Sequence, residues 1–185
     1  MTEESDLYTE SGDHYAPTEA YLRSRLQTMD PDTFEHFIAD VWEQLGWYTR
    51  VVGEPGDKGI DVIAAREGQK QLVQAKRYGP NTTVGSPEVQ QYASLRLQED
   101  GVDTVTIVTT GEFSRQAEDM APDLGVTLVD GEDLLGILDD FDGWGVVADY
   151  FDELKLREDV EAADRDDDRG DDAGGWVDRV REWVP

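Results

Sequence analysis

The sequence predicts an α/β domain in which helices flank a central mixed β-sheet. Two observations support this fold class. Helical and strand-like apolar patterns alternate along the chain, and 185 residues with 38% hydrophobic content suffice for one core but leave little room for a second. The expected order is one helix, three strands, and then helix, strand, helix, strand and helix.

A capped helix opens this domain after a short helical turn at 21–26. Asp30 and Pro31 suit the N-cap and the first position of a helix, and apolar residues then follow at helical spacing up to Leu45. Gly46 provides a C-terminal stop. The aromatic side chains of this helix are predicted to lie in the core because they recur at that spacing.

A strand and a hairpin are predicted next. Residues 47–52 are rich in aromatic and β-branched side chains, and the turn-forming sequence at 53–57 ends that strand. The arms of the hairpin are expected at 60–65 and 71–78, joined by the polar stretch 66–70.

The second half of the domain alternates between helices and strands. Ser86, Pro87 and Glu88 mark a capped helix start, and Ser114 is expected to cap a later helix that continues through Met120. The remaining expected elements are strands at 104–109 and 127–129, a helix at 132–138, and an amphipathic helix within 141–157.

Both ends of the chain are expected to lie outside the domain, which we assign to residues 21–140. Residues 1–20 are polar and acidic without a sustained apolar period, which predicts a flexible segment. The acidic run at 158–175 is expected to be a disordered linker after the helix in 141–157. Residues 176–185 carry two tryptophans at helical spacing and predict a short terminal amphipathic helix.

The net charge of −27 taken alone argues against a nucleic-acid partner, because phosphate repels an acidic protein in dilute salt. However, only four of the sixteen basic residues are lysine and the acidic excess is spread along the chain, a pattern that resembles halophilic proteins. In molar salt the Debye length falls to about 3 Å, so local charge outweighs net charge. Residues 50–77 form such a locally positive segment.

Composition also limits the location of the protein and the metals that it can bind. No apolar run is long enough for a membrane span and acidic residues follow Met1, so neither a span nor a secretory signal is expected and the protein should be cytoplasmic. Without cysteine, and with only His14 and His36, a thiolate or histidine-rich zinc site is not expected. Oxygen ligands favour Mg²⁺ or Mn²⁺.

A candidate site lies on the predicted hairpin. Because side chains alternate along a strand, Gln74 and Lys76 point to one face beside Asp61, while Val73 and Ala75 point to the other. Phosphodiester hydrolysis needs a carboxylate-held divalent ion that activates water, and a cation that stabilises the developing charge. Asp61 and Lys76 have the required residue types.

These residues resemble a known nuclease signature. Asp61 followed by Gln74-Ala75-Lys76 is similar to the Mrr-family variant of the PD-(D/E)xK motif, with glutamine in place of the acidic residue. Further matches are Phe34-Glu35-His36-Phe37, Gly59-Ile60-Asp61, Val108-Thr109-Thr110-Gly111, Phe113-Ser114 with Ala117, and Leu128-Val129-Asp130-Gly131 with Leu134. The resemblance extends from about Asp32 to Leu138. It implies a three-layer restriction-endonuclease-like fold with acidic tails.

The resemblance also implies a metal-dependent DNA endonuclease of the restriction or DNA-repair type. Asp61 would be the principal metal ligand, and Gln74 a side-chain ligand or a residue that positions water. The Ala75 carbonyl would be a further ligand, Lys76 the catalytic cation, and Glu35 a member of the outer shell. Mg²⁺, with Mn²⁺ as a substitute, is the implied cofactor. DNA is the implied partner, and a homodimer is expected because one such site cuts one strand.

Two nearby basic residues are expected to contact DNA. Lys58 lies in the turn before Asp61, and Arg77 follows Lys76 and is expected to grip the phosphate backbone. The structural alternative for this region is a solvated strand face with an incidental ion pair. For Glu35 the alternative is an acidic residue favoured by the dipole of its helix.

Two other functions remain open. One is a catalytically silent nucleic-acid-binding or assembly module on the same fold, which the glutamine at position 74 supports. The other is an acidic adaptor whose tails recruit partners or mimic nucleic acid. Metal-dependent cleavage distinguishes the first of these from an endonuclease.

Overall fold

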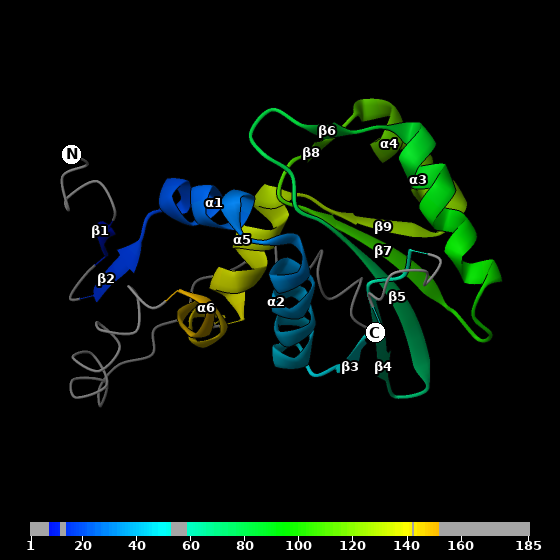
Figure 1. Ribbon diagram of the computed structural model, residues 1–185, viewed down its shortest axis with the longest axis horizontal. Coiled ribbons are helices and arrows are strands. Elements are labelled where there is room, and N and C mark those ends of the chain that lie inside the picture. The colour runs from blue at the N-terminus through cyan, green and yellow to red at the C-terminus, as the bar shows by residue number, and fades with distance from the viewer. Residues whose placement is uncertain (1–7, 12–13, 53–58, 142, 152–185) are drawn as a thin grey trace.

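A five-stranded mixed sheet forms the centre of the domain (Figure 1). The fold is seen in a computed structural model that describes residues 8–11, 14–52, 59–141 and 143–151. In spatial order the strands are β3 (Tyr48–Val51), β4 (Val62–Arg66), β5 (Gln69–Lys76), β7 (Thr104–Thr109) and β9 (Val126–Val129). Strands β3, β4 and β5 pair antiparallel, whereas β5, β7 and β9 pair parallel. The predicted α/β class with a mixed sheet is confirmed.

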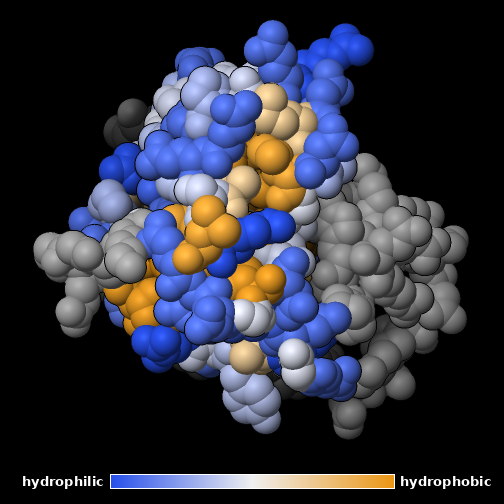
Figure 2. Space-filling model, turned by 90° about the vertical axis from the view of Figure 1, so that its right-hand side faces the viewer, coloured by the Kyte–Doolittle hydropathy of each residue, from blue (hydrophilic) through white to orange (hydrophobic). Residues whose placement is uncertain are grey.

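Helices cover both faces of the sheet and give three layers (Figure 1). One face packs against α1 (Glu19–Thr28), α2 (Pro31–Gln44), α5 (Gly131–Asp140) and α6 (Trp144–Tyr150). The other packs against α3 (Ser86–Ala93), α4 (Arg115–Met120) and the 3₁₀ turns at Ser94–Leu97 and Pro122–Leu124. The face that lies on the right-hand side of Figure 1 is largely hydrophilic and carries a few apolar patches (Figure 2).

Two apolar cores lie on opposite faces of the sheet because strand side chains alternate. On β5, Val73 and Ala75 belong to the core under α2 and α5, and Leu72 belongs to the core under α3. On β7, Val108 and Ile107 divide between the two cores in the same way. The alternation predicted for the hairpin is therefore confirmed.

Two of the predicted helix caps, at Asp30 and Ser114, are found. The Asp30 carboxylate accepts hydrogen bonds from the main-chain nitrogens of Asp32 and Thr33, at 3.1 and 3.2 Å, and so satisfies two donors that the first turn of α2 leaves unpaired. The Ser114 hydroxyl accepts one from the Ala117 nitrogen at 3.2 Å and begins α4. These caps set where both helices start.

Two predicted boundaries are wrong. The hairpin loop is only Glu67 and Gly68, whose φ angles of 50° and 87° suit the tight two-residue turn that a twisted hairpin favours. The N-cap of α3 is Gly85 rather than Ser86. The carboxylate of Glu88 accepts a hydrogen bond from the Gly85 nitrogen at 3.0 Å, which replaces the side-chain cap that glycine cannot provide.

Four short strands were not predicted. Strands β1 (Tyr8–Ser11) and β2 (His14–Pro17) form an antiparallel pair inside the stretch expected to be only a flexible segment. Strands β6 (Thr83–Val84) and β8 (Glu112–Phe113) form a parallel pair. All four are too short to show an apolar period, so main-chain pairing rather than side-chain pattern defines them.

The C-terminal predictions can be compared with the structure only up to residue 151. Helix α6 lies within the range 141–157 predicted to contain a helix. The predicted linker at 158–175 and the terminal helix at 176–185 lie outside the described residues. Across the described part of the chain, no helix is long and apolar enough to cross a membrane.

Candidate active site

Asp61 lies immediately before β4 and is held against β5. Its main-chain nitrogen donates to the Val73 oxygen at 3.3 Å, and its side chain is only 7% exposed. The Oδ2 atom accepts hydrogen bonds from the Ala75 main-chain nitrogen, at 2.7 Å, and from Nε2 of Gln74. The carboxylate is therefore fixed in place by two donors from one neighbouring strand.

Gln74 is almost completely buried, with 1% exposure, although it is polar. Its Nε2 is used by Asp61, whereas its Oε1 is buried and has no hydrogen-bond partner among the described residues. A Cβ atom at Gly59 would lie 3.8 Å from that oxygen, so Gly59 borders it. Leaving a buried acceptor unpaired costs about 1–3 kcal/mol, which points to a ligand for Oε1.

Lys76 lies two residues after Gln74 and shares its face of the sheet. It is half-buried at the end of β5, and its Nζ is 5.2 Å from the ring centroid of Tyr92 on α3. A cation over an aromatic face is attracted by the quadrupole of the ring. Helix α3 thus holds the ammonium group on the side of the sheet to which Gln74 points.

Two tyrosines and a carboxylate line the α3 side of the site. Burial, followed by the charges of Glu88 and Asp61, raises the pKa of Tyr92. Burial and then the Glu88 carboxylate, to which the Tyr78 hydroxyl donates at 3.2 Å, raise the pKa of Tyr78 to about 12. Both hydroxyls are therefore neutral near pH 7.

Sequence reasoning missed Tyr92 and Tyr78 as members of the site. It placed Tyr78 only at the end of the second hairpin arm. One signal was available, since Tyr92 follows Glu88 by four residues and so lies on the same helix face.

The oxygen atoms around Asp61 suit a divalent cation. The N–H and C=O groups of one strand residue point to the same edge, so the Ala75 carbonyl points to the edge on which its nitrogen donates to Asp61. Together with Gln74 Oε1 this gives one carboxylate and two neutral oxygens, ligands that Mg²⁺ accepts when water completes the shell. Among the described residues, no three His, Asp or Glu side chains form a metal-binding group.

Glu35 lies on α2, and this helix packs on the face of the sheet opposite to the one that carries Gln74. Glu35 is half-buried on α2, two helical turns before Trp42, whose Nε1 donates to Oε1 of Gln71 on β5 at 2.5 Å. Helix α2 packs on the face that carries Val73. The metal role of Glu35 stays a prediction.

The two predicted DNA contacts have different outcomes. Lys58 lies outside the described residues. Arg77 is half-buried and points to the α1 side, where its Nη1 donates to the Gln27 main-chain oxygen at 3.5 Å. His36 is exposed on α2, with Nδ1 2.9 Å from the Asp32 oxygen.

Comparison with known proteins adds a family and a fold. A family model named Mrr_cat and described as restriction endonuclease matches residues 26–138, more than half of the chain. The MspJI restriction endonuclease, solved in complex with a 27-mer oligonucleotide, superposes with a TM-score of 0.55 and 23% identity over 82% of this chain and 38% of its own. The DNA modification-dependent restriction endonuclease AspBHI gives a TM-score of 0.54 and 22% identity over 72% and 41%.

At this level of identity the two structures show a common fold, which is the expected three-layer restriction-endonuclease-like arrangement. The chain spans about two fifths of the length of each of them. No curated protein matches the chain.

Proposed function

This chain belongs to the restriction endonuclease family, and on that premise we propose that it is a DNA endonuclease that depends on a divalent metal ion. One observation carries the proposal: the buried Asp61 carboxylate accepts hydrogen bonds from Gln74 and Ala75, and Lys76 lies two residues after Gln74 on β5. The oligonucleotide bound in the MspJI structure supports DNA as the substrate.

In the proposed site, the Asp61 carboxylate, the Gln74 amide oxygen and the Ala75 carbonyl would hold Mg²⁺ or Mn²⁺. A divalent ion supplies charge neutralisation at the phosphate and lowers the pKa of a water nucleophile. Lys76 would place its ammonium group against the phosphoryl oxygens, where negative charge increases in the transition state. Tyr92 limits the positions that the ammonium can take, because its ring lies against Nζ.

A second candidate function is a nucleic-acid-binding module without catalysis. The observation that favours it is the hydrogen bond from Gln74 to Asp61, because the amide nitrogen uses a carboxylate oxygen that a metal would need. A module of this kind would bind DNA and leave it intact with or without metal.

Plasmid nicking separates the two functions. The full chain is incubated in concentrated potassium chloride with supercoiled plasmid, with EDTA, Mg²⁺ or Mn²⁺, beside Asp61→Ala, Lys76→Ala and Arg115→Ala. Arg115 is an exposed residue of α4 and serves as the control. Nicking that requires metal, persists in the Arg115 variant and disappears in the other two supports the endonuclease. Intact plasmid in every reaction, with DNA binding retained, supports the module.

We also propose that the chain works as a homodimer, since one site of this kind cuts one strand. Light scattering in the assay buffer gives the oligomeric state. A dimer that linearises plasmid would support paired sites, whereas a monomer that only nicks would contradict this proposal.

A further inference from the structure

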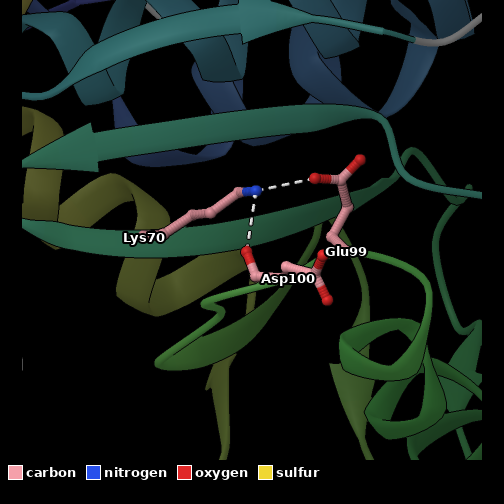
Figure 3. A network of polar contacts seen from close by, with 3 residues as sticks. All are labelled: Lys70, Glu99 and Asp100. Carbon is pink, nitrogen blue, oxygen red and sulfur yellow. Dashed lines mark hydrogen bonds and ion pairs between the residues drawn. The ribbon is translucent and has the colours of Figure 1, made fainter.

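Several basic side chains of the domain form hydrogen bonds with groups inside the domain. Lys70, at the β4–β5 hairpin, donates to Glu99 Oε2 at 2.6 Å and to the Asp100 main-chain oxygen at 3.1 Å (Figure 3). The guanidinium groups of Arg66 and Arg96 donate to main-chain carbonyls of neighbouring segments. Lys70 is therefore paired with a carboxylate and is poorly placed to receive an anionic ligand.

Arg77 and Arg23 lie at the carboxyl ends of β5 and β7. Gln27 of α1 donates from Nε2 to the Thr110 oxygen at 3.1 Å, and its own main-chain oxygen accepts from Arg77 at 3.5 Å. A Cβ atom at position 131 would lie 2.8 Å from the Thr110 oxygen and 3.4 Å from Nη1 of Arg23. The Arg77 guanidinium thus contacts the main chain of Gln27, and the Arg23 guanidinium lies near the Thr110 oxygen to which the Gln27 side chain donates.

Neither of these arginines is neutralised within the part of the chain that the structure describes. No carboxylate there forms an ion pair with Arg23 or Arg77, and Nε of Arg77, like Nε of Arg25 and Arg96, is buried without a hydrogen-bond partner. This is unexpected in a protein with 43 acidic and 16 basic residues. Guanidinium groups match phosphate oxygens through two parallel hydrogen bonds, so an unneutralised pair suits a phosphate ligand.

The position of the pair relates it to the proposed active site. Arg77 directly follows Lys76, and the two side chains point to opposite faces of the sheet because they alternate along the chain. A DNA strand that crosses the end of β5 would therefore meet Lys76 on the α3 side and Arg77 on the α1 side. Arg23 lies outside residues 26–138, so the family match does not account for it.

We propose that Arg23 and Arg77 form a second phosphate-binding position, which holds the DNA backbone next to the phosphate that is cut. This inference rests on the proposed nuclease function. It assigns a role to α1, a helix whose first seven of ten residues precede the family match.

The salt dependence of DNA binding tests this position. Anisotropy of a fluorescent duplex is measured with the full chain in EDTA, over a series of potassium chloride concentrations, for wild type, Arg23→Gln, Arg77→Gln and Arg115→Gln. Each lost phosphate contact lowers the slope of log K against log salt concentration by about 0.9. We expect that decrease in the first two variants and no change in the Arg115 control, with Arg23→Lys and Arg77→Lys retaining most of the slope.

The outcomes separate the two proposals. Unchanged slopes in folded Arg23→Gln and Arg77→Gln proteins, while wild type still nicks plasmid, would overturn the phosphate-binding position and leave the nuclease intact. A wild type that neither nicks nor binds DNA would overturn both. In a third outcome, wild type binds inorganic phosphate, and Arg77→Gln abolishes this binding without changing the salt slope of DNA binding. That result would assign a site for free anions and contradict the DNA contact.

Discussion

Nε2 of Gln74 donates a hydrogen bond to Oδ2 of Asp61, the same oxygen that accepts from the Ala75 main-chain nitrogen. The other amide atom of Gln74, Oε1, is buried without a partner among the described residues. A half-turn of the Gln74 side-chain amide would exchange the positions of Nε2 and Oε1. Gln74 can therefore satisfy the carboxylate with its nitrogen in the absence of metal, or present an oxygen to a cation.

Replacing Gln74 by glutamate should destabilise the metal-free protein and tighten its binding of metal. The change removes the donor to Asp61 and buries a second carboxylate beside it, which we expect to cost about 1–3 kcal/mol of unfolding free energy. Thermal unfolding in EDTA and calorimetric titration with Mn²⁺ measure the two effects. Gln116→Glu, at an exposed position of α4, is the matched control. Equal metal affinity in wild type and Gln74→Glu would argue against a metal at this site.

Tyr92 should matter through its ring rather than its hydroxyl. The Lys76 ammonium lies against the ring, an interaction of about 0.5–2 kcal/mol, so Tyr92→Leu should slow nicking several-fold while Tyr92→Phe retains most of the rate. An upfield NMR shift of the Lys76 side-chain protons, present in the phenylalanine variant and absent in the leucine variant, checks the contact independently of activity. Equal rates in both variants would show that the ring does not position Lys76.

Gly59→Ala should affect both the fold and the site. Gly59 has φ +82°, where a Cβ atom costs about 1–2 kcal/mol, and the added methyl group would also border Gln74 Oε1. Gly68→Ala is a matched control, because Gly68 has φ +87° and no atom near its Cβ position. We expect similar losses of unfolding free energy in both variants, with weaker Mn²⁺ binding in the Gly59 variant alone. Equal Mn²⁺ affinities would contradict a role for Gly59 at the site.

Alkaline pH should destabilise the domain partly through Tyr78. Its pKa is raised by burial and by the Glu88 carboxylate, from 10.0 to about 12 in the folded protein. The folded state then binds more protons than the unfolded state between these values, so this stabilisation is complete below pH 10 and is lost as pH rises toward 12. Urea unfolding at increasing alkaline pH should show a shallower decline for Tyr78→Phe. Parallel declines would exclude Tyr78 as a contributor.

Much of the site could be predicted because it depends on short-range rules. The period-2 alternation of a strand places Gln74 and Lys76 on one face, and the structure confirms that Val73 and Ala75 lie on the other. Asp61 comes next to Gln74 because a hairpin pairs residues that are close in sequence. The same rules failed for β6 and β8, since strands of two residues carry no period.

The sequence by itself determined the α/β class, the caps at Asp30 and Ser114, and the polar face of the hairpin, because turn chemistry and side-chain periodicity act over a few residues. Only the tertiary structure decided that Tyr92 covers Lys76 and that Arg23 comes close to Thr110. These contacts join separate elements across the sheet. Their geometry depends on how α3 and α1 pack on the two cores, and that packing is a property of the whole apolar surface buried between the layers.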